Sequence, residues 1–236
     1  MRNTVSNFYI YFIINAEKVN RYLKKKQIYG NIKHGKFMYK GEPMKIILAS
    51  KSPRRKEILS NLNIEFEIIT ADTDENSDII LPEALVEELA FRKAFAVKEL
   101  LSAQGDYGED YVIIGCDTIV SKDNKILGKP ENREDAISML TMLSDSEHKV
   151  ISGLAVLKGN EKTVSHEVTK VYFDKLTADE IKSYTETGEC DDKAGAYGIQ
   201  GLASKFIKGI DGCYFNVVGL PVNLLYRIFK ELEIQF

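Results

Sequence analysis

The sequence predicts an α/β fold built on a mixed sheet, and three observations support this prediction. Short apolar runs typical of buried strands alternate with amphipathic stretches typical of helices. Further along, two strand-like runs flank a single turn, a pattern typical of an antiparallel hairpin. The chain has 236 residues, 44% hydrophobic and 28% charged, a balance typical of a soluble globular protein with a sizeable core. No apolar run approaches the roughly 20 residues that a transmembrane helix requires.

The first part of the predicted domain contains two strands and two helices. We expect strands at residues 45–49 and 66–70. Ser52-Pro53 predicts a helix start, because Ser is a favoured N-cap and Pro a favoured first helical residue. A long amphipathic helix is expected from Pro82 to about Leu101. Its buried side is expected to consist of Leu85, Leu89, Ala90, Val97 and Leu100.

The central part continues this alternation. Residues 111–114 are expected to form an apolar strand that ends in the GCDT segment, residues 115–118. Asp123-Asn124 predicts a turn, and residues 133–143 are expected to form a helix.

The last part begins with the predicted hairpin. Its strands are expected at residues 150–157 and 163–173, on either side of Gly159-Asn160. Residues 177–180 match a capping box before another helix, and the final helix is expected from Pro221 to near Leu232. This order of elements predicts one domain with strands of both directions in its sheet.

Residues 1–43 differ from the rest of the chain. They contain nine Lys or Arg and two Asp or Glu, a net charge of +7, which leaves −10 for the other 193 residues. Their apolar run, residues 8–14, lacks the flanks and cleavage site of a signal peptide, and a basic membrane-surface helix is weakly supported. We interpret residues 1–43 as an N-terminal extension, disordered or upstream of the true start at Met44, and residues 44–236 as the functional domain.

The charge and the cysteines of this domain argue against several classes of protein. A protein that binds nucleic acid duplexes normally has a basic folded part, whereas this one is acidic. An acidic protein can still bind an anionic substrate when a divalent metal neutralises the contact. Cys116, Cys190 and Cys213 are far apart and odd in number, which argues against a disulfide framework or a structural zinc site and fits a reducing cytoplasm.

Two segments at predicted strand ends are candidates for phosphate chemistry. Residues 50–55 lead into a helix start, where unpaired N–H groups and the helix dipole receive phosphate, and Arg54 and Arg55 add charge-assisted hydrogen bonds. A capped helix with solvated arginines fits this segment equally well. Asp117 can bind a metal or take a proton from water, although a turn Asp that bonds its own backbone is the commoner case.

Two further segments have ligand-binding composition. The carboxylates of DTDE at 72–75 suit Mg²⁺, but such a cluster is more often a solvated loop. The small residues of KAGAYGIQG at 193–201 let the backbone approach a ligand closely, and Gln200 offers a donor and an acceptor to a base edge. A tight structural loop is the alternative. Residues 128–130, GKP, lack the spacing of a P-loop.

In combination, these segments resemble the Maf family of nucleoside triphosphate pyrophosphatases over about residues 44–232. The matching motifs are LASKSPRR at 48–55, DTDE at 72–75, GCDTIV at 115–120, LGKP at 127–130, HKVISG at 148–153, DKAGAYGIQG at 192–201 and VVGLPV at 217–222. The resemblance implies a mixed twisted sheet flanked by helices, as in Maf and ITPase proteins, with a central nucleotide cleft. Two departures are mild: Cys116 replaces the usual small Ala, and Ser152 stands where Thr is usual.

The resemblance also implies a reaction. It is hydrolysis of the α–β phosphoanhydride of a nucleoside triphosphate to a monophosphate and pyrophosphate, with Mg²⁺ or Mn²⁺ as cofactor. Asp117 would be the proton acceptor and, with Glu75, a metal ligand. Substrate choice would depend on Arg54, Thr118 and Gln200. The other pocket residues implied are Ser52, Arg55, Lys93, Lys129 and Lys193.

The family has at least two branches, and KAGAYGIQG resembles the loop of the branch that prefers dTTP and UTP. The family further implies a housecleaning role against non-standard nucleotides and a homodimer. Two alternatives stay open. One is the other branch, which hydrolyses 7-methyl-GTP. The other is a non-catalytic, nucleotide-binding regulator of cell division, since the family also has a septum-inhibition label; a pure binder would not need Asp117 and the lysines together.

Overall fold

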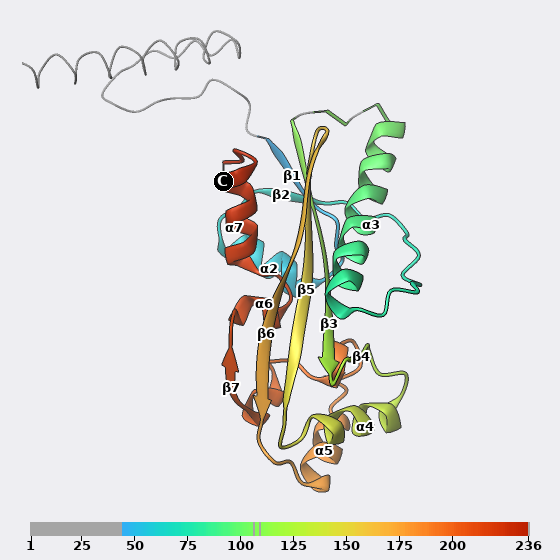
Figure 1. The fold of residues 1–236 in the computed structure, drawn as a ribbon, viewed down its shortest axis with the longest axis vertical. Coiled ribbons are helices and arrows are strands. Elements are labelled where there is room, and N and C mark those ends of the chain that lie inside the picture. The colour runs from blue at the N-terminus through green and yellow to red at the C-terminus, as the bar shows by residue number, and fades with distance from the viewer. Residues whose placement is uncertain (1–43, 106, 109, 236) are drawn as a thin grey trace, which may run out of the picture. The chain divides into compact units, whose positions relative to one another are not determined.

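The computed structural model describes residues 44–105, 107–108 and 110–235. They contain a seven-stranded sheet in the order β2-β1-β3-β5-β6-β7, with β4 paired to β3 (Figure 1). The strands are β1 (Lys45–Leu48), β2 (Phe66–Ile68), β3 (Tyr111–Lys122), β4 (Lys125–Leu127), β5 (Glu147–Lys158), β6 (Glu161–Phe173) and β7 (Ile207–Asp211). The predicted extension, residues 1–43, lies outside the described residues.

Strands of both directions form this sheet. β1 is parallel to β2 and β3, whereas β3 pairs antiparallel with β4 and β5, and β5-β6-β7 continue antiparallel. The helices are α2 (Pro53–Asn61), α3 (Pro82–Ala103), α4 (Arg133–Leu143), α5 (Ala178–Thr185), α6 (Tyr214–Val218) and α7 (Val222–Glu231), with 3-10 turns η1 (Ala194–Ala196) and η2 (Leu202–Phe206). The predicted mixed α/β fold is confirmed. Within the described part of the chain, every helix is too short or too polar to cross a membrane.

Several local predictions are confirmed. Pro53 begins α2, although the Ser52 side chain makes no capping hydrogen bond. Thr177 and Glu180 form the predicted capping box at the start of α5, each side chain accepting a hydrogen bond from the other residue's backbone N–H. α4 has its predicted bounds, and β5 and β6 form the predicted hairpin.

The prediction that Asp117 follows a short strand was wrong. β3 continues through the GCDT segment, where Asp117 pairs with Gly153 and Thr118 with Ser152 of β5. Thr118, Ile119 and Val120 are β-branched and favour extended backbone, so the strand does not turn at Asp117. Asp117 therefore lies in mid-strand, on a backbone that is fixed by its neighbours on both sides.

The predicted buried side of α3 was wrong at two positions. Leu85 is half-buried and Leu100 is 38% exposed. The buried residues are Pro82, Val86, Leu89, Ala90, Ala94, Val97 and Leu101. Helical spacing of three or four residues leads from Ala90 back to Val86, and from Ala94 through Val97 to Leu101. The prediction therefore placed the buried side one residue too early at each end, at Leu85 and Leu100.

Alternation along β3 assigns its side chains to the two layers of helices, one on each face of the sheet. Ile114 and Cys116 pack in a cluster with α2 and α7, whereas Ile113 packs in a cluster with α3. In Figure 1, α2 and α7 lie on the side of the strands opposite to α3. Since successive side chains of a strand point to opposite faces, Asp117 faces α3 and Thr118 faces α2. The centre of β3 thus presents one polar side chain to each layer of helices.

A buried histidine gives the fold a predictable pH dependence. His148 on β5 is 2% exposed, and its Nε2 is 2.7 Å from the Tyr197 hydroxyl. Burial, and then the charge of Lys122, lower the pKa of His148 from 6.5 to about 3. Unfolding frees the imidazole to bind a proton below pH 6.5. Its contribution to stability is therefore present above pH 6.5 and is lost as the pH falls from 6.5 toward 3.

We expect the free energy of unfolding to fall, on this account, by up to about 1.4 kcal/mol per pH unit within that window. The variant His148→Gln cannot be protonated and should show a shallower slope in urea unfolding between pH 6.5 and 4. Carboxylates titrate in both proteins, so the difference between the two curves isolates the histidine. Parallel curves would contradict this assignment.

Candidate active site

A cavity of about 730 Å³ lies where the start of α2, the middle of α3 and several loops converge on β3. This volume is within the range of small-molecule sites. Every predicted site residue lines it: Ser52, Arg54, Arg55, Glu75, Lys93, Asp117, Thr118, Lys129, Lys193 and Gln200. Residues that are up to 148 positions apart in the sequence are thus brought to one cavity.

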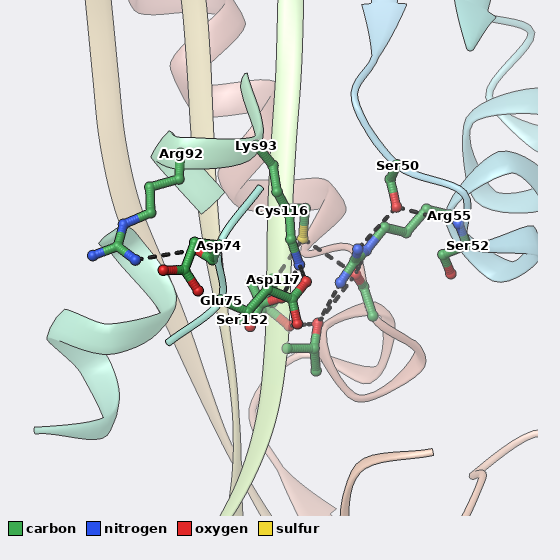
Figure 2. Close-up of polar contacts among 12 residues, drawn as sticks. Ser50, Ser52, Arg55, Asp74, Glu75, Arg92, Lys93, Cys116, Asp117 and Ser152 are labelled. Carbon is green, nitrogen blue, oxygen red and sulfur yellow. Dashed lines mark hydrogen bonds and ion pairs between the residues drawn. The ribbon is translucent and has the colours of Figure 1, made fainter. Parts of the chain in front are cut away.

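Asp117 and Lys93 form an ion pair in the cavity. The Lys93 ammonium donates to Asp117 Oδ1 at 2.5 Å, and the two side chains are 19% and 13% exposed (Figure 2). The same ammonium lies 2.9 Å from Glu75 Oε1. One cation on α3 therefore joins the mid-strand carboxylate to the loop after β2.

Two glycines let α3 lie close enough for this contact. A Cβ at Gly115 would overlap the carbonyl oxygen of Ala90, and one at Gly153 would overlap that of Val86. Gly115 is on β3, and Gly153, on β5, pairs with Asp117 of β3. α3 therefore packs directly on strand backbone beside the Asp117 carboxylate. Lys93, one turn from Ala90, then reaches the strand.

The charges of this group stabilise one another. The hydrogen bond from Lys93 lowers the pKa of Glu75; burial opposes this, and the charges of Lys93, Lys129 and Arg55 add to it. Burial disfavours the charged form of Lys93, but Asp117 and Glu75 outweigh it and raise the pKa of Lys93 above its usual range. Lys93 is thus an ammonium at neutral pH.

Arg92 fixes the loop that contains Glu75. Its Nη1 donates to the carbonyl oxygen of Asp74 at 3.1 Å (Figure 2). It also donates to the carbonyl oxygen of Asn76 at 2.8 Å, and its Nε donates to Glu88. The guanidinium therefore binds the backbone on both sides of Glu75. No feature of the sequence distinguished Arg92 from an exposed helical arginine.

Arg55 approaches β3 from α2. Its Nε donates to the carbonyl oxygen of Gly219 at 2.8 Å, Nη1 to Ser50 Oγ at 3.0 Å and Nη2 to Thr118 Oγ1 at 3.1 Å (Figure 2). A guanidinium has five N–H donors in a fixed plane, so three bonds orient it and two donors remain for a ligand. Sequence reasoning missed the supporting residues Ser50 and Gly219, although both lie within the quoted motifs.

The two departures from the expected motifs, Ser152 and Cys116, both contact groups around Thr118. Ser152 is buried, with its hydroxyl 2.8 Å from that of Thr118 and donating to the carbonyl oxygen of Asn216. The Cys116 thiol lies 3.3 Å from the carbonyl oxygen of Gly219, and burial raises its pKa. Cys116 is therefore a neutral, buried thiol on the side of β3 away from Asp117.

Arg54 and Lys193 share one carboxylate at the cavity edge. Arg54 Nη1 is 3.6 Å and Lys193 Nζ 2.6 Å from Asp192, and the hydrogen bond from Lys193, against opposing burial, lowers the pKa of Asp192. Lys193 also donates to the carbonyl oxygen of Glu189 at 2.5 Å. These contacts connect the start of α2 to the loop that contains Gln200, itself exposed.

Comparison with known proteins places this arrangement in a family. The family of Maf-like proteins matches residues 45–232. The chain belongs to the Maf family. A "dTTP/UTP pyrophosphatase" of Desulforamulus reducens is 52% identical over 80% of this chain and 97% of its own length. Proteins of the same name from Caldanaerobacter subterraneus and Clostridium perfringens are 48% and 45% identical, over 80% and 81% of this chain and 89% and 98% of their own lengths.

Among solved structures, the Ham1 protein of Staphylococcus aureus is 13% identical, with a TM-score of 0.47 over 79% of this chain and 98% of that one. This likeness is too distant to support a conclusion. Assignment to the Maf family rests on the match across residues 45–232.

Proposed function

We propose that this Maf protein hydrolyses dTTP and UTP to the monophosphate and pyrophosphate. The observation that carries the proposal is the position of Asp117 in a cavity of nucleotide size. There Asp117 contacts Lys93, and the next residue, Thr118, accepts a hydrogen bond from Arg55. The names of relatives at 45–52% identity support the choice of substrate. We expect the reaction in the cytoplasm, and the homodimer stays an expectation.

The cavity residues have complementary roles in this reaction. The Asp117 carboxylate accepts a proton from water, whose oxygen attacks the α-phosphorus. The bond from that phosphorus to the bridging oxygen breaks, and pyrophosphate leaves with the electron pair. Lys93, Arg55 and Lys129 offset the phosphate charge and orient the chain of phosphates, with Ser52 and Lys193 nearby.

Glu75 and Asp117 fit a divalent cation, Mg²⁺ or Mn²⁺. One oxygen of each carboxylate contacts the Lys93 ammonium, so the two carboxylates lie close enough together to bind one cation. Residues 44–105, 107–108 and 110–235 contain no group of three or more His, Cys, Asp or Glu that could hold a metal. Two carboxylates suffice for Mg²⁺, which takes its other ligands from water and substrate phosphates. When bound, the cation would neutralise phosphate charge.

A nucleotide panel tests this function. With Mg²⁺, the full chain should release pyrophosphate faster from dTTP and UTP than from CTP, GTP or 7-methyl-GTP. Faster release from 7-methyl-GTP would assign the chain to the other branch. Nucleotide binding without pyrophosphate release would instead favour the regulator.

Gln200 is proposed to recognise the base. We expect Gln200→Ala to reduce the ratio of kcat/KM for UTP to that for CTP by roughly tenfold, the effect of about one hydrogen bond, with little loss of kcat. The control is Gln104→Ala, at the end of α3, which should leave the ratio unchanged. An unaltered ratio in the Gln200 variant would count against base recognition by this side chain.

A further inference from the structure

Glu189 contacts both ends of the loop that contains Gln200. Its carboxylate accepts hydrogen bonds from the backbone N–H of Leu202 at 2.9 Å and from the Tyr184 hydroxyl at 3.1 Å. Its carbonyl oxygen accepts from Lys193 at 2.5 Å. The segment 193–202 includes every residue of KAGAYGIQG. Its first residue, Lys193, and its last, Leu202, are thus both hydrogen-bonded to Glu189.

The glycines of the loop show how closely it packs on these groups. A Cβ at Gly201 would overlap the carboxylate of Glu189, and a Cβ at Gly198 would lie 2.8 Å from Lys193 Cε. Gln200 lies between these two glycines, exposed and lining the cavity. The backbone position of Gln200 therefore depends on the carboxylate beneath Gly201.

Tyr184 ties this carboxylate to the core. The ring of Tyr184 is 2% exposed and lies edge-on to Phe206, 5.5 Å between centroids. Burial, and then the charge of Glu189, raise the pKa of Tyr184, so its hydroxyl remains a donor. Glu189 is thus oriented by a residue of α5 whose own position is fixed by packing.

We infer that Glu189 is a positioning residue for selection of a pyrimidine base. It acts through Gln200 by fixing the loop, and this role rests on the proposed function. The carboxylate itself is engaged by Leu202 and Tyr184, so it acts on the base through the loop rather than by contact.

The test compares Glu189→Ala, Glu189→Gln and the control Glu186→Ala, a change at the C-cap of α5. We expect Glu189→Ala to raise KM for UTP and to reduce the UTP-to-CTP ratio of kcat/KM about tenfold, with kcat changed less than threefold. Glu189→Gln keeps one side-chain oxygen, which can accept from the backbone N–H of Leu202, and its NH₂ group can donate to the Tyr184 hydroxyl oxygen. This variant should therefore restore most of the ratio. Gly201→Ala should reproduce the effect of Glu189→Ala.

A second measurement separates this inference from the proposed function. Dissociation constants of non-hydrolysable UTP and CTP analogues report base selection even if the protein does not turn them over. Glu189→Ala could instead lower the melting temperature but leave unchanged both the UTP-to-CTP ratio of kcat/KM and the ratio of the dissociation constants. That result would overturn the inference but not the proposed pyrophosphatase activity. A second outcome is that the wild type binds the UTP analogue selectively but releases no pyrophosphate, and that Glu189→Ala loses this selectivity. That result would support the inference and overturn the proposed activity. No nucleotide binding by the wild type would overturn both.

Discussion

Replacing Asp117 with Asn is expected to lower the rate of pyrophosphate release from UTP by roughly 10²–10⁴-fold, the usual contribution of a general base. The amide has the size of the carboxylate and still accepts a hydrogen bond from Lys93, but it cannot take a proton from water. Since Asp117 lies in mid-strand between paired neighbours, the backbone should not move. The measurement is single-turnover pyrophosphate release at saturating nucleotide, with the melting temperature recorded in parallel.

The matched control is Asp123→Asn, in the turn between β3 and β4. Asp123 has φ +49°, a conformation that Asn accepts readily, and its side chain is exposed. This variant should keep wild-type turnover. Activity of Asp117→Asn within threefold of the wild type would exclude Asp117 as the base.

The sequence predicted the composition of the site better than its geometry. All ten expected residues line one cavity, because the segments quoted for the family are those that surround it. The position of Asp117 was missed because a GCDT segment after four apolar residues fits a strand end as well as a strand interior. The long pairing with β5, which local sequence does not reveal, decides between them.

The supporting contacts could not be predicted because they join distant segments. Arg55 donates to Gly219, 164 residues away, and this requires α6 to lie beside α2. Likewise the approach of α3 to β3 depends on Gly115 and Gly153 lying side by side, which follows from the β3–β5 register. Hydrophobic periodicity assigns faces within one element, but such contacts depend on how the elements are assembled.

Arg55→Lys should lower kcat/KM for UTP by roughly 10- to 100-fold, because a point charge replaces a planar group oriented by three bonds. Loss of one charge-assisted hydrogen bond to phosphate, about 1.5–3 kcal/mol, accounts for this range. The lysine ammonium cannot satisfy Gly219, Ser50 and Thr118 together and also reach a ligand. We therefore expect KM for dTTP and UTP to rise in parallel, since the change concerns phosphate and not the base.

Lys56→Gln provides the control, on the same turn of α2 but exposed and outside the cavity lining. It should leave kcat/KM within twofold of the wild type. The Arg55 variant should also lose about 1–3 kcal/mol of stability, since the carbonyl of Gly219 and the buried Ser50 hydroxyl each lose a charge-assisted hydrogen bond from the guanidinium. If stability falls by this amount while kcat/KM does not change, Arg55 joins α2 to α6 without binding phosphate, and the cations on which the proposed function depends are those of Lys93 and Lys129 instead.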